Sequence, residues 1–148
     1  MSTADKKETL TSYFKVVMED YEEAVFQSCD GLQSEIEVIY VPEGGRGGAP
    51  HAVRGLPKVN KILFGKGSLS SKGGKKTLFD WYMEVCDFSK PLKRQTLTIQ
   101  LLDAKKSALR TWKVLDAWPC RWMGPALNRE NADVTVEYLE FAHEGITA

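Results

Sequence analysis

Residues 95–103, QTLTIQLLD, and residues 107–118, SALRTWKVLDAW, decide the fold class of this chain. In the first stretch, leucine and isoleucine alternate with threonine and glutamine, which is the period-two pattern of a half-buried β-strand. The short polar segment at 104–106 predicts a turn that joins the two stretches as a hairpin. This part of the chain therefore predicts antiparallel β structure.

Four other stretches predict strands on either side of this hairpin. Residues 12–18, SYFKVVM, and 24–29, AVFQSC, are rich in aromatic and β-branched residues and predict a first hairpin. Residues 59–69, VNKILFGKGSL, predict one more strand, and residues 132–143, ADVTVEYLEFAH, predict the last. In the last stretch the apolar residues change phase near Tyr138, which indicates a bulge or a strand that leaves one sheet for another surface.

Residues 33–41, QSEIEVIYV, alternate cleanly between apolar and polar. Ile36, Val38 and Tyr40 fall on one face and two glutamates on the other, which predicts a half-buried strand. The next residues, 42–57, PEGGRGGAPHAVRGLP, contain five glycines and three prolines and predict a long flexible loop. A loop of this length inside a compact domain is usually functional, so we expect a docking element here.

One helix is predicted, over residues 77–87, TLFDWYMEVCD. Thr77 is a suitable N-cap, and Asp80 three positions later closes an approximate capping box. Residues 119–128, PCRWMGPALN, are punctuated by proline and glycine and predict an irregular connection. Many short strands with one helix predict a mainly β fold, a sandwich or a barrel. The aromatic side chains expected in buried or interface positions are Trp81, Tyr82, Trp112, Trp118 and Trp122.

Length and composition are those of one globular domain, with 148 residues, a mass of 16.6 kDa, 43% hydrophobic and 27% charged residues. We expect residues 1–11 to form a flexible N-terminal arm and residues 12–148 a single β domain. The chain shows neither a membrane-spanning apolar run nor a secretory signal, so we expect a protein made in the cytoplasm without a membrane anchor. Three cysteines argue against a disulfide framework, and we expect each to be a small buried hydrophobe.

The zero net charge conceals two blocks of opposite sign. The acidic block is Glu19, Asp20, Glu22, Glu23, Asp30, Glu35, Glu37 and Glu43. The basic block is Arg46, Arg54, Lys58, Lys61, Lys66, Lys72, Lys75 and Lys76. Either these charges only solvate the surface, or they form one acidic and one basic surface. The second arrangement fits a copy of the same chain placed head to tail, which produces rings or filaments.

The sequence predicts no catalytic, metal or cofactor site, and we expect no enzyme. The glycine–lysine clusters fail the spacing of the phosphate-binding motifs. His51 and His143 lack metal-ligand spacing to a cysteine or to each other. Asp80 and Glu84 would project together from the helix, but we expect them to solvate its outer face.

The alternative to a structural protein is a basic-faced β-barrel that binds nucleic acid or another polyanion. Residues 46–76 would supply the positive charge for that role. Proteins that bind single strands usually interleave aromatic side chains with the charge, whereas this block contains only Phe64. The sparse aromatic content makes this the weaker hypothesis.

The C-terminal half carries a family resemblance. Residues 117–128, AWPCRWMGPALN, and 134–145, VTVEYLEFAHEG, resemble the tail tube proteins of contractile phage tails and of phage-derived extracellular contractile injection systems. Shorter motifs agree in order and spacing across residues 12–146. They are DGL at 30–32, EIEV at 35–38, EGG at 43–45, GLP at 55–57, FDWY at 79–82 and LLD at 101–103.

This resemblance implies two packed antiparallel sheets with one helix. It also implies that six copies form a ring and that rings stack into a hollow tube inside a contractile sheath. The tube would stand on a baseplate with a spike, end at a tube-terminating protein, and conduct DNA or a protein effector. The sequence leaves open whether the particle is a phage tail or a non-phage injection system.

The candidate contacts between subunits lie in and beside the glycine-rich loop, where the resemblance implies a loop that touches neighbouring subunits. We expect Arg46, Arg54 and Lys58 to meet carboxylates of a neighbour. The full set of candidate residues is Glu35, Glu37, Glu43, Arg46, Arg54 and Lys58.

Overall fold

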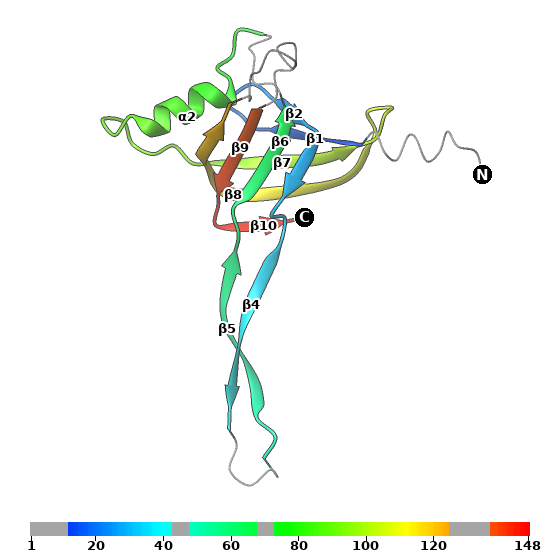
Figure 1. Ribbon diagram of the computed structural model, residues 1–148, viewed down its shortest axis with the longest axis vertical. Coiled ribbons are helices and arrows are strands. Elements are labelled where there is room, and N and C mark those ends of the chain that lie inside the picture. Colours follow the sequence, from blue (N-terminus) through cyan, green and yellow to red (C-terminus); the bar gives the residue numbers. More distant parts are fainter. Residues whose placement is uncertain (1–11, 43–47, 68–72, 125–136) are drawn as a thin grey trace, which may run out of the picture.

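The computed structural model describes residues 12–42, 48–67, 73–124 and 137–148 (Figure 1). Within these ranges the chain forms strands and one helix, α2. The elements are β1 (Tyr13–Val17), β2 (Ala24–Phe26), β3 (Ser28–Asp30), β4 (Ser34–Val41), β5 (His51–Val59), β6 (Ile62–Gly67), α2 (Leu78–Cys86), β7 (Gln95–Leu102), β8 (Ala108–Met123), β9 (Glu137–Ala142) and β10 (Gly145–Thr147). The predicted mainly β fold with one helix is confirmed.

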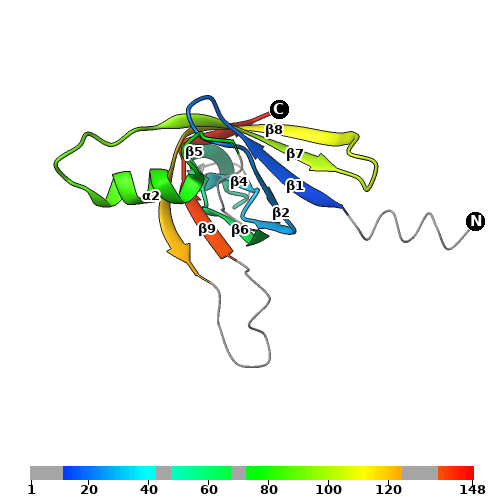
Figure 2. The ribbon, with the colours of Figure 1, turned by 90° about the horizontal axis from the view of Figure 1, so that it is seen from above.

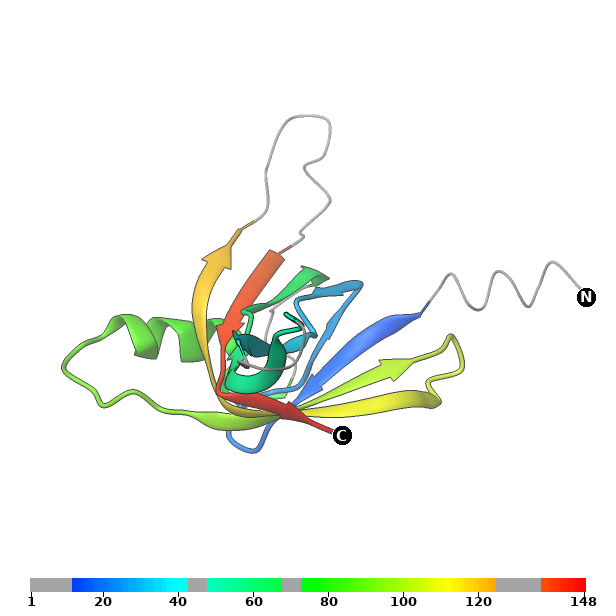
Figure 3. The same cartoon turned by 90° about the horizontal axis from the view of Figure 1, so that it is seen from below.

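The body of the molecule is one antiparallel sheet with the strand order β2-β1-β7-β8-β9-β6-β3, and β10 pairs with β8. The long strand β8 pairs with β7 along its first part and with β9 along its second. Asp116, at the register shift within the part that pairs with β7, has a φ of 50°, the left-handed conformation that an aspartate tolerates better than most residues. The sheet curls into two packed layers (Figures 2 and 3), and the backbone N–H of Gln27, beside β2, donates to Gly65 O of β6 at 3.1 Å.

The core lies inside this curl and combines aliphatic side chains with a group of packed aromatic rings. Phe64 lies between Phe26 and Phe141, with ring centroids 5.1 and 5.8 Å away. Trp81 of α2 packs on Phe141 at 5.6 Å and stacks on Tyr21 at 4.9 Å. Its side chain is fully buried, which confirms the expected burial of Trp81. The other tryptophans and Tyr82 are half-buried against this core.

Helix α2 begins where the sequence predicts. Thr77 is the N-cap, and its hydroxyl accepts from the backbone N–H of Asp80 at 3.3 Å. The Asp80 carboxylate accepts from the backbone N–H of Thr77 at 2.8 Å, which completes the capping box. One expectation for this region is wrong: Cys86 is exposed at the end of the helix. Cys29 and Cys120 are half-buried.

Two segments predicted as irregular are strands. Residues 119–123 continue β8, and Pro119 is tolerated because a bulge follows it and this part of the strand pairs with β9 alone. The sequence predicts a flexible loop for residues 51–57, but these residues belong to strand β5. The segment at 125–136, which includes the start of the predicted last strand, lies outside the described residues.

Candidate assembly surface

Strands β4 and β5 form a hairpin that stands away from the body (Figure 1). They pair antiparallel with each other, from Ser34 opposite Val59 to Val41 opposite His51, and form a separate two-stranded sheet. We call β4 and β5 together the projecting hairpin. A two-stranded ribbon of this kind is at best marginally stable in water by itself.

The local sequence explains how a glycine- and proline-containing stretch forms β5. The register shifts between Ile36 and Val38, so that Gly55 and Leu56 lie opposite Glu37 as a bulge. A Cβ on Gly55 would lie 3.0 Å from the Cβ of Glu37, so the glycine makes room for that side chain. Pro57 is compatible with β5 because the strand has a partner on one side only.

The apolar side chains of the hairpin are exposed on both of its faces. Ile36, Val38 and Tyr40 share one face, as predicted, but they are 51%, 54% and 65% exposed. Ile39 and Val41 on the other face are also exposed. The expectation that one face of this strand packs within the subunit is therefore wrong. A group of exposed apolar side chains on one element is typical of an interaction site.

The charged candidate residues divide between the two faces of the hairpin. Lys58 lies opposite Glu35 on one face, and Glu37 lies on the same face. Arg54 lies opposite Val38, beside the Ile36, Val38 and Tyr40 side chains. The hairpin therefore carries both signs, and among the described residues the acidic and basic blocks are not separated into two surfaces. Glu43 and Arg46 lie outside the described residues.

The basic block does not form a continuous positive face in the described part of the chain. Arg54 and Lys58 belong to the projecting hairpin, Lys66 to β6, and Lys75 and Lys76 to the segment before α2. These elements extend from the far end of the hairpin to the opposite end of the molecule (Figure 1). This distribution gives no support to a polyanion-binding groove.

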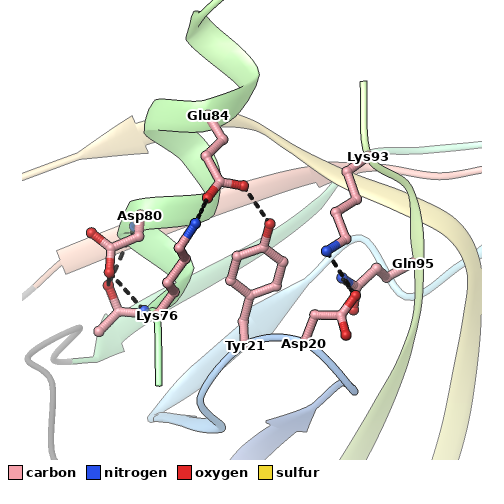
Figure 4. Close-up of polar contacts among 8 residues, drawn as sticks. Asp20, Tyr21, Lys76, Asp80, Glu84, Lys93 and Gln95 are labelled. Carbon is pink, nitrogen blue, oxygen red and sulfur yellow. Dashed lines mark hydrogen bonds and ion pairs between the residues drawn. The ribbon is translucent and has the colours of Figure 1, made fainter. Parts of the chain in front are cut away.

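A polar network fixes α2 against the turn between β1 and β2 (Figure 4). Glu84 accepts from the Tyr21 hydroxyl and from the Lys76 ammonium, both at 2.6 Å. The bond from Lys76, followed by that from Tyr21, lowers the pKa of Glu84. Burial, followed by the bond to Glu84, raises the pKa of Tyr21. Beside this network the Lys93 ammonium pairs with Asp20 at 2.8 Å.

His143, Arg94 and Cys29 interact with neighbouring residues of the same subunit. His143 Nε2 lies 2.7 Å from the carbonyl oxygen of Asn60, and Arg94 pairs with Glu144 at 2.8 Å. Burial, followed by the charge of Asp30, raises the pKa of the Cys29 thiol to about 12, which keeps the thiol protonated. Among the described residues there is no cluster of His, Cys, Asp or Glu that could hold a metal ion. In the same part of the chain, no helix is long and apolar enough to cross a membrane.

The curled β body and the projecting hairpin with its exposed apolar faces define the class: a structural β protein built for assembly. A family model described as T4-like virus tail tube protein gp19 matches residues 10–147. The chain therefore belongs to this tail tube protein family and is a structural subunit of a tube. Members of the family assemble into phage or phage-like particles. No curated protein matches the chain.

Several solved structures share the fold, among them one from an extracellular contractile injection system. A chain of the PVC sheath–tube complex in the extended state is 22% identical, with 99% of this chain and 97% of that chain covered and a TM-score of 0.72. A chain of the anti-feeding prophage cap is 20% identical over 90% of this chain and 85% of that chain, with a TM-score of 0.70. Hcp1 from Flavobacterium johnsoniae is 12% identical over 91% and 93%, with a TM-score of 0.51.

Proposed function

We propose that six copies of this chain form a ring, that rings stack head to tail into a hollow tube, and that the projecting hairpin joins neighbouring copies. The observation that carries this proposal is the exposure of Ile36, Val38 and Tyr40 on a hairpin that belongs to no larger sheet. Fully burying such side chains contributes about 1.5–3 kcal/mol each, and part of that remains available to a neighbour. The subunit alone leaves this free energy unused.

The proposal extends to the partners and to the place of assembly. The similar PVC structure is a sheath–tube complex, and the anti-feeding prophage structures include a baseplate and a tube-terminating cap. By this similarity, the tube contacts a sheath protein, begins at a baseplate with its spike, and ends at a terminator. Its lumen conducts DNA or a protein effector. Subunits made in the cytoplasm enter a phage tail or a phage tail-like particle that can be released.

We further propose that residues 12–148 act as one tube-forming domain and that residues 1–11 are an arm outside it. The charged candidate residues guide the orientation of neighbouring copies, because like charges would meet in a reversed copy. Each exposed pair contributes about 0–1 kcal/mol, so their effect comes from repetition around a ring.

Electron microscopy with native mass measurement of the purified protein tests the proposal. Rings of six subunits and stacked tubes are expected. The variant Ile36→Lys, Val38→Lys, Tyr40→Lys should remain folded, because these side chains face solvent in the subunit, but it should form no tubes. The matched control Ile36→Val, Val38→Ile, Tyr40→Phe should assemble. A wild-type protein that stays monomeric at high concentration, even beside its baseplate partners, contradicts the proposal.

A second test concerns the charges. Reversal of Arg46, Arg54 and Lys58 to glutamate should block tube growth and leave the subunit folded, as judged by circular dichroism. Raised salt should slow growth of wild-type tubes, because it screens exposed pairs. Normal tubes from the triple variant would show that these three residues only solvate the surface or line the lumen.

A further inference from the structure

A cavity of about 420 Å³ lies between α2 and the loop that leads from it to β7. Its lining combines apolar side chains with two lysines and one carboxylate: Trp81, Glu84, Val85, Lys90, Pro91, Leu92 and Lys93. The loop stands out from the body beyond the end of α2 (Figure 2). Phe88, in the same loop, is 98% exposed and adds apolar surface near the cavity.

We propose that this cavity receives Tyr40 from the projecting hairpin of a second copy. The inference rests on the assembly function proposed above and assigns the surface that receives the hairpin. The proposed contact joins the cavity beside α2 in one copy to the exposed Tyr40 side chain of another copy.

The chemistry of the cavity suits an aromatic ring with a polar tip. Lys93 already places its ammonium 5.3 Å from the centroid of the Tyr21 ring, so one aromatic ring is held here by a cation. Lys90, which also lines the cavity, can act in the same way on a second ring that packs against Val85 and Leu92. Tyrosine combines an apolar body with a hydroxyl that can remain hydrated at the mouth of such a cavity.

Tyr40 is the side chain of the hairpin that fits this description. It is 65% exposed and lies opposite Ala52, so no large side chain of β5 covers it. Arg54 lies on the same face, two residues along β5 from Ala52, and is therefore a diagonal neighbour of Tyr40. The incoming surface is thus an aromatic ring accompanied by one positive charge.

The lining carries two lysines, and its one carboxylate, Glu84, is already paired with Lys76, so Arg54 does not enter the cavity itself. The acidic group next to the cavity at the end of α2 is Asp87, the C-cap of the helix. A helix C-terminus carries partial negative charge, so Asp87 and the adjoining carbonyl groups attract a cation. We assign Arg54 of the second copy to this end of α2, next to Tyr40 in the cavity.

The projecting hairpin lies at one end of the subunit, and α2, which lines the cavity together with the loop after it, lies toward the other end (Figure 1). A contact between two different surfaces is heterologous, so each copy can donate its hairpin to one neighbour and receive the hairpin of another. This arrangement repeats from copy to copy, as the growth of a tube requires.

Chemical cross-linking of assembled tubes tests the inference. The variant Tyr40→Cys, Leu92→Cys is made with Cys86→Ser, because Cys86 is an exposed thiol at the end of α2. A short bismaleimide should join the cysteines of different copies and give a ladder of covalent oligomers. The matched control Tyr40→Cys, Met83→Cys, in the same background, should give at least tenfold less product, because the exposed Met83 is not part of the cavity lining.

Hydrogen exchange of wild-type protein provides a second measurement if the double-cysteine variant does not assemble. Amides of residues 85–93 and of β4 should both slow at least tenfold when subunits form tubes. Wild-type tubes in which residues 85–93 exchange as fast as in the free subunit overturn the inference, as does cross-linking no stronger than the control. In either case the tube function still stands. If the wild type forms no tubes, both the tube function and this inference fail.

Discussion

Strands β4 and β7 have the same length and the same alternating pattern, but they have opposite surroundings. In β7, Leu97 and Ile99 are fully buried inside the curled sheet. In β4, Ile36 and Val38 are about half exposed on a hairpin that stands away from that sheet. A period-two pattern therefore specifies a strand with an apolar face, but not which surface covers that face.

The body and the projecting hairpin should also have different roles, the body in stability and the hairpin in assembly. The body obtains its stability from contacts within the subunit, in which Trp81, Phe64 and Phe141 share one core. The exposed side chains of the hairpin contribute little to the free energy of unfolding of the subunit, so substitutions there should change assembly instead.

Truncation of a buried aromatic side chain in the body should lower the free energy of unfolding far more than truncation of an exposed one in the hairpin. Trp81→Ala removes a fully buried indole that contacts Tyr21 and Phe141, and it should lower the free energy of unfolding by about 3–5 kcal/mol. Tyr40→Ala in the hairpin should change it by less than about 0.5 kcal/mol. Chemical denaturation of the unassembled subunit measures both values. Equal losses would contradict the division between body and hairpin.

Added methyl groups at two glycines should have unequal costs. At Gly67 a Cβ would lie 2.4 Å from the Phe26 ring, which is fully buried, so Gly67→Ala should cost about 1–3 kcal/mol. At Gly55 the close atoms are the Cβ, Cγ and backbone oxygen of Glu37 at 3.0–3.1 Å, a less severe approach than at Gly67, so Gly55→Ala should cost less than Gly67→Ala. Thermal unfolding of the two variants provides the comparison. A Gly67→Ala subunit as stable as the wild type would mean that Phe26 can move aside.

The Glu84 network should make the body sensitive to acid. The pKa of Glu84 is lowered in the folded state, so its contribution to stability is present above its unfolded value and is lost as the pH falls through the folded value. Glu84→Gln should cost about 1–2 kcal/mol at pH 7 and less at pH 3. Denaturation curves at both pH values measure this difference. Glu35→Gln in the hairpin is the matched control, and a cost for Glu84→Gln that is the same at both pH values would contradict the assignment.

The smallest effect on stability is expected from a charge reversal at Lys58, which lies opposite Glu35 in the hairpin. Lys58→Glu places two carboxylates opposite each other on neighbouring strands, which should destabilise the hairpin by about 0.2–1 kcal/mol. Amide exchange should become faster in β4 and stay unchanged in β7. Addition of salt should reduce the difference. Faster exchange throughout the body would show that the hairpin is coupled to the core.

Much of the body follows from the sequence because its signals are local. Alternation in residues 95–103 and the aromatic, β-branched residues of 12–18 specify strands, and both stretches are strands in the structure. The capping box of Thr77 and Asp80 fixes the start of α2 through two hydrogen bonds between residues three positions apart. The order of short motifs along the chain likewise indicates the tail tube family, which the family match confirms.

Other features depend on contacts between distant residues, and only the tertiary structure decided them. Glycine and proline in residues 51–57 suggest a loop, but pairing with β4 makes them a strand, since a bulge at Gly55 and an edge position for Pro57 remove the usual penalties. The cavity beside Trp81 unites residues from a helix and the loop after it, a placement that no local pattern specifies. The exposure of Ile36, Val38 and Tyr40 was undetermined for the same reason, because alternation defines an apolar face and only packing in three dimensions decides what covers it.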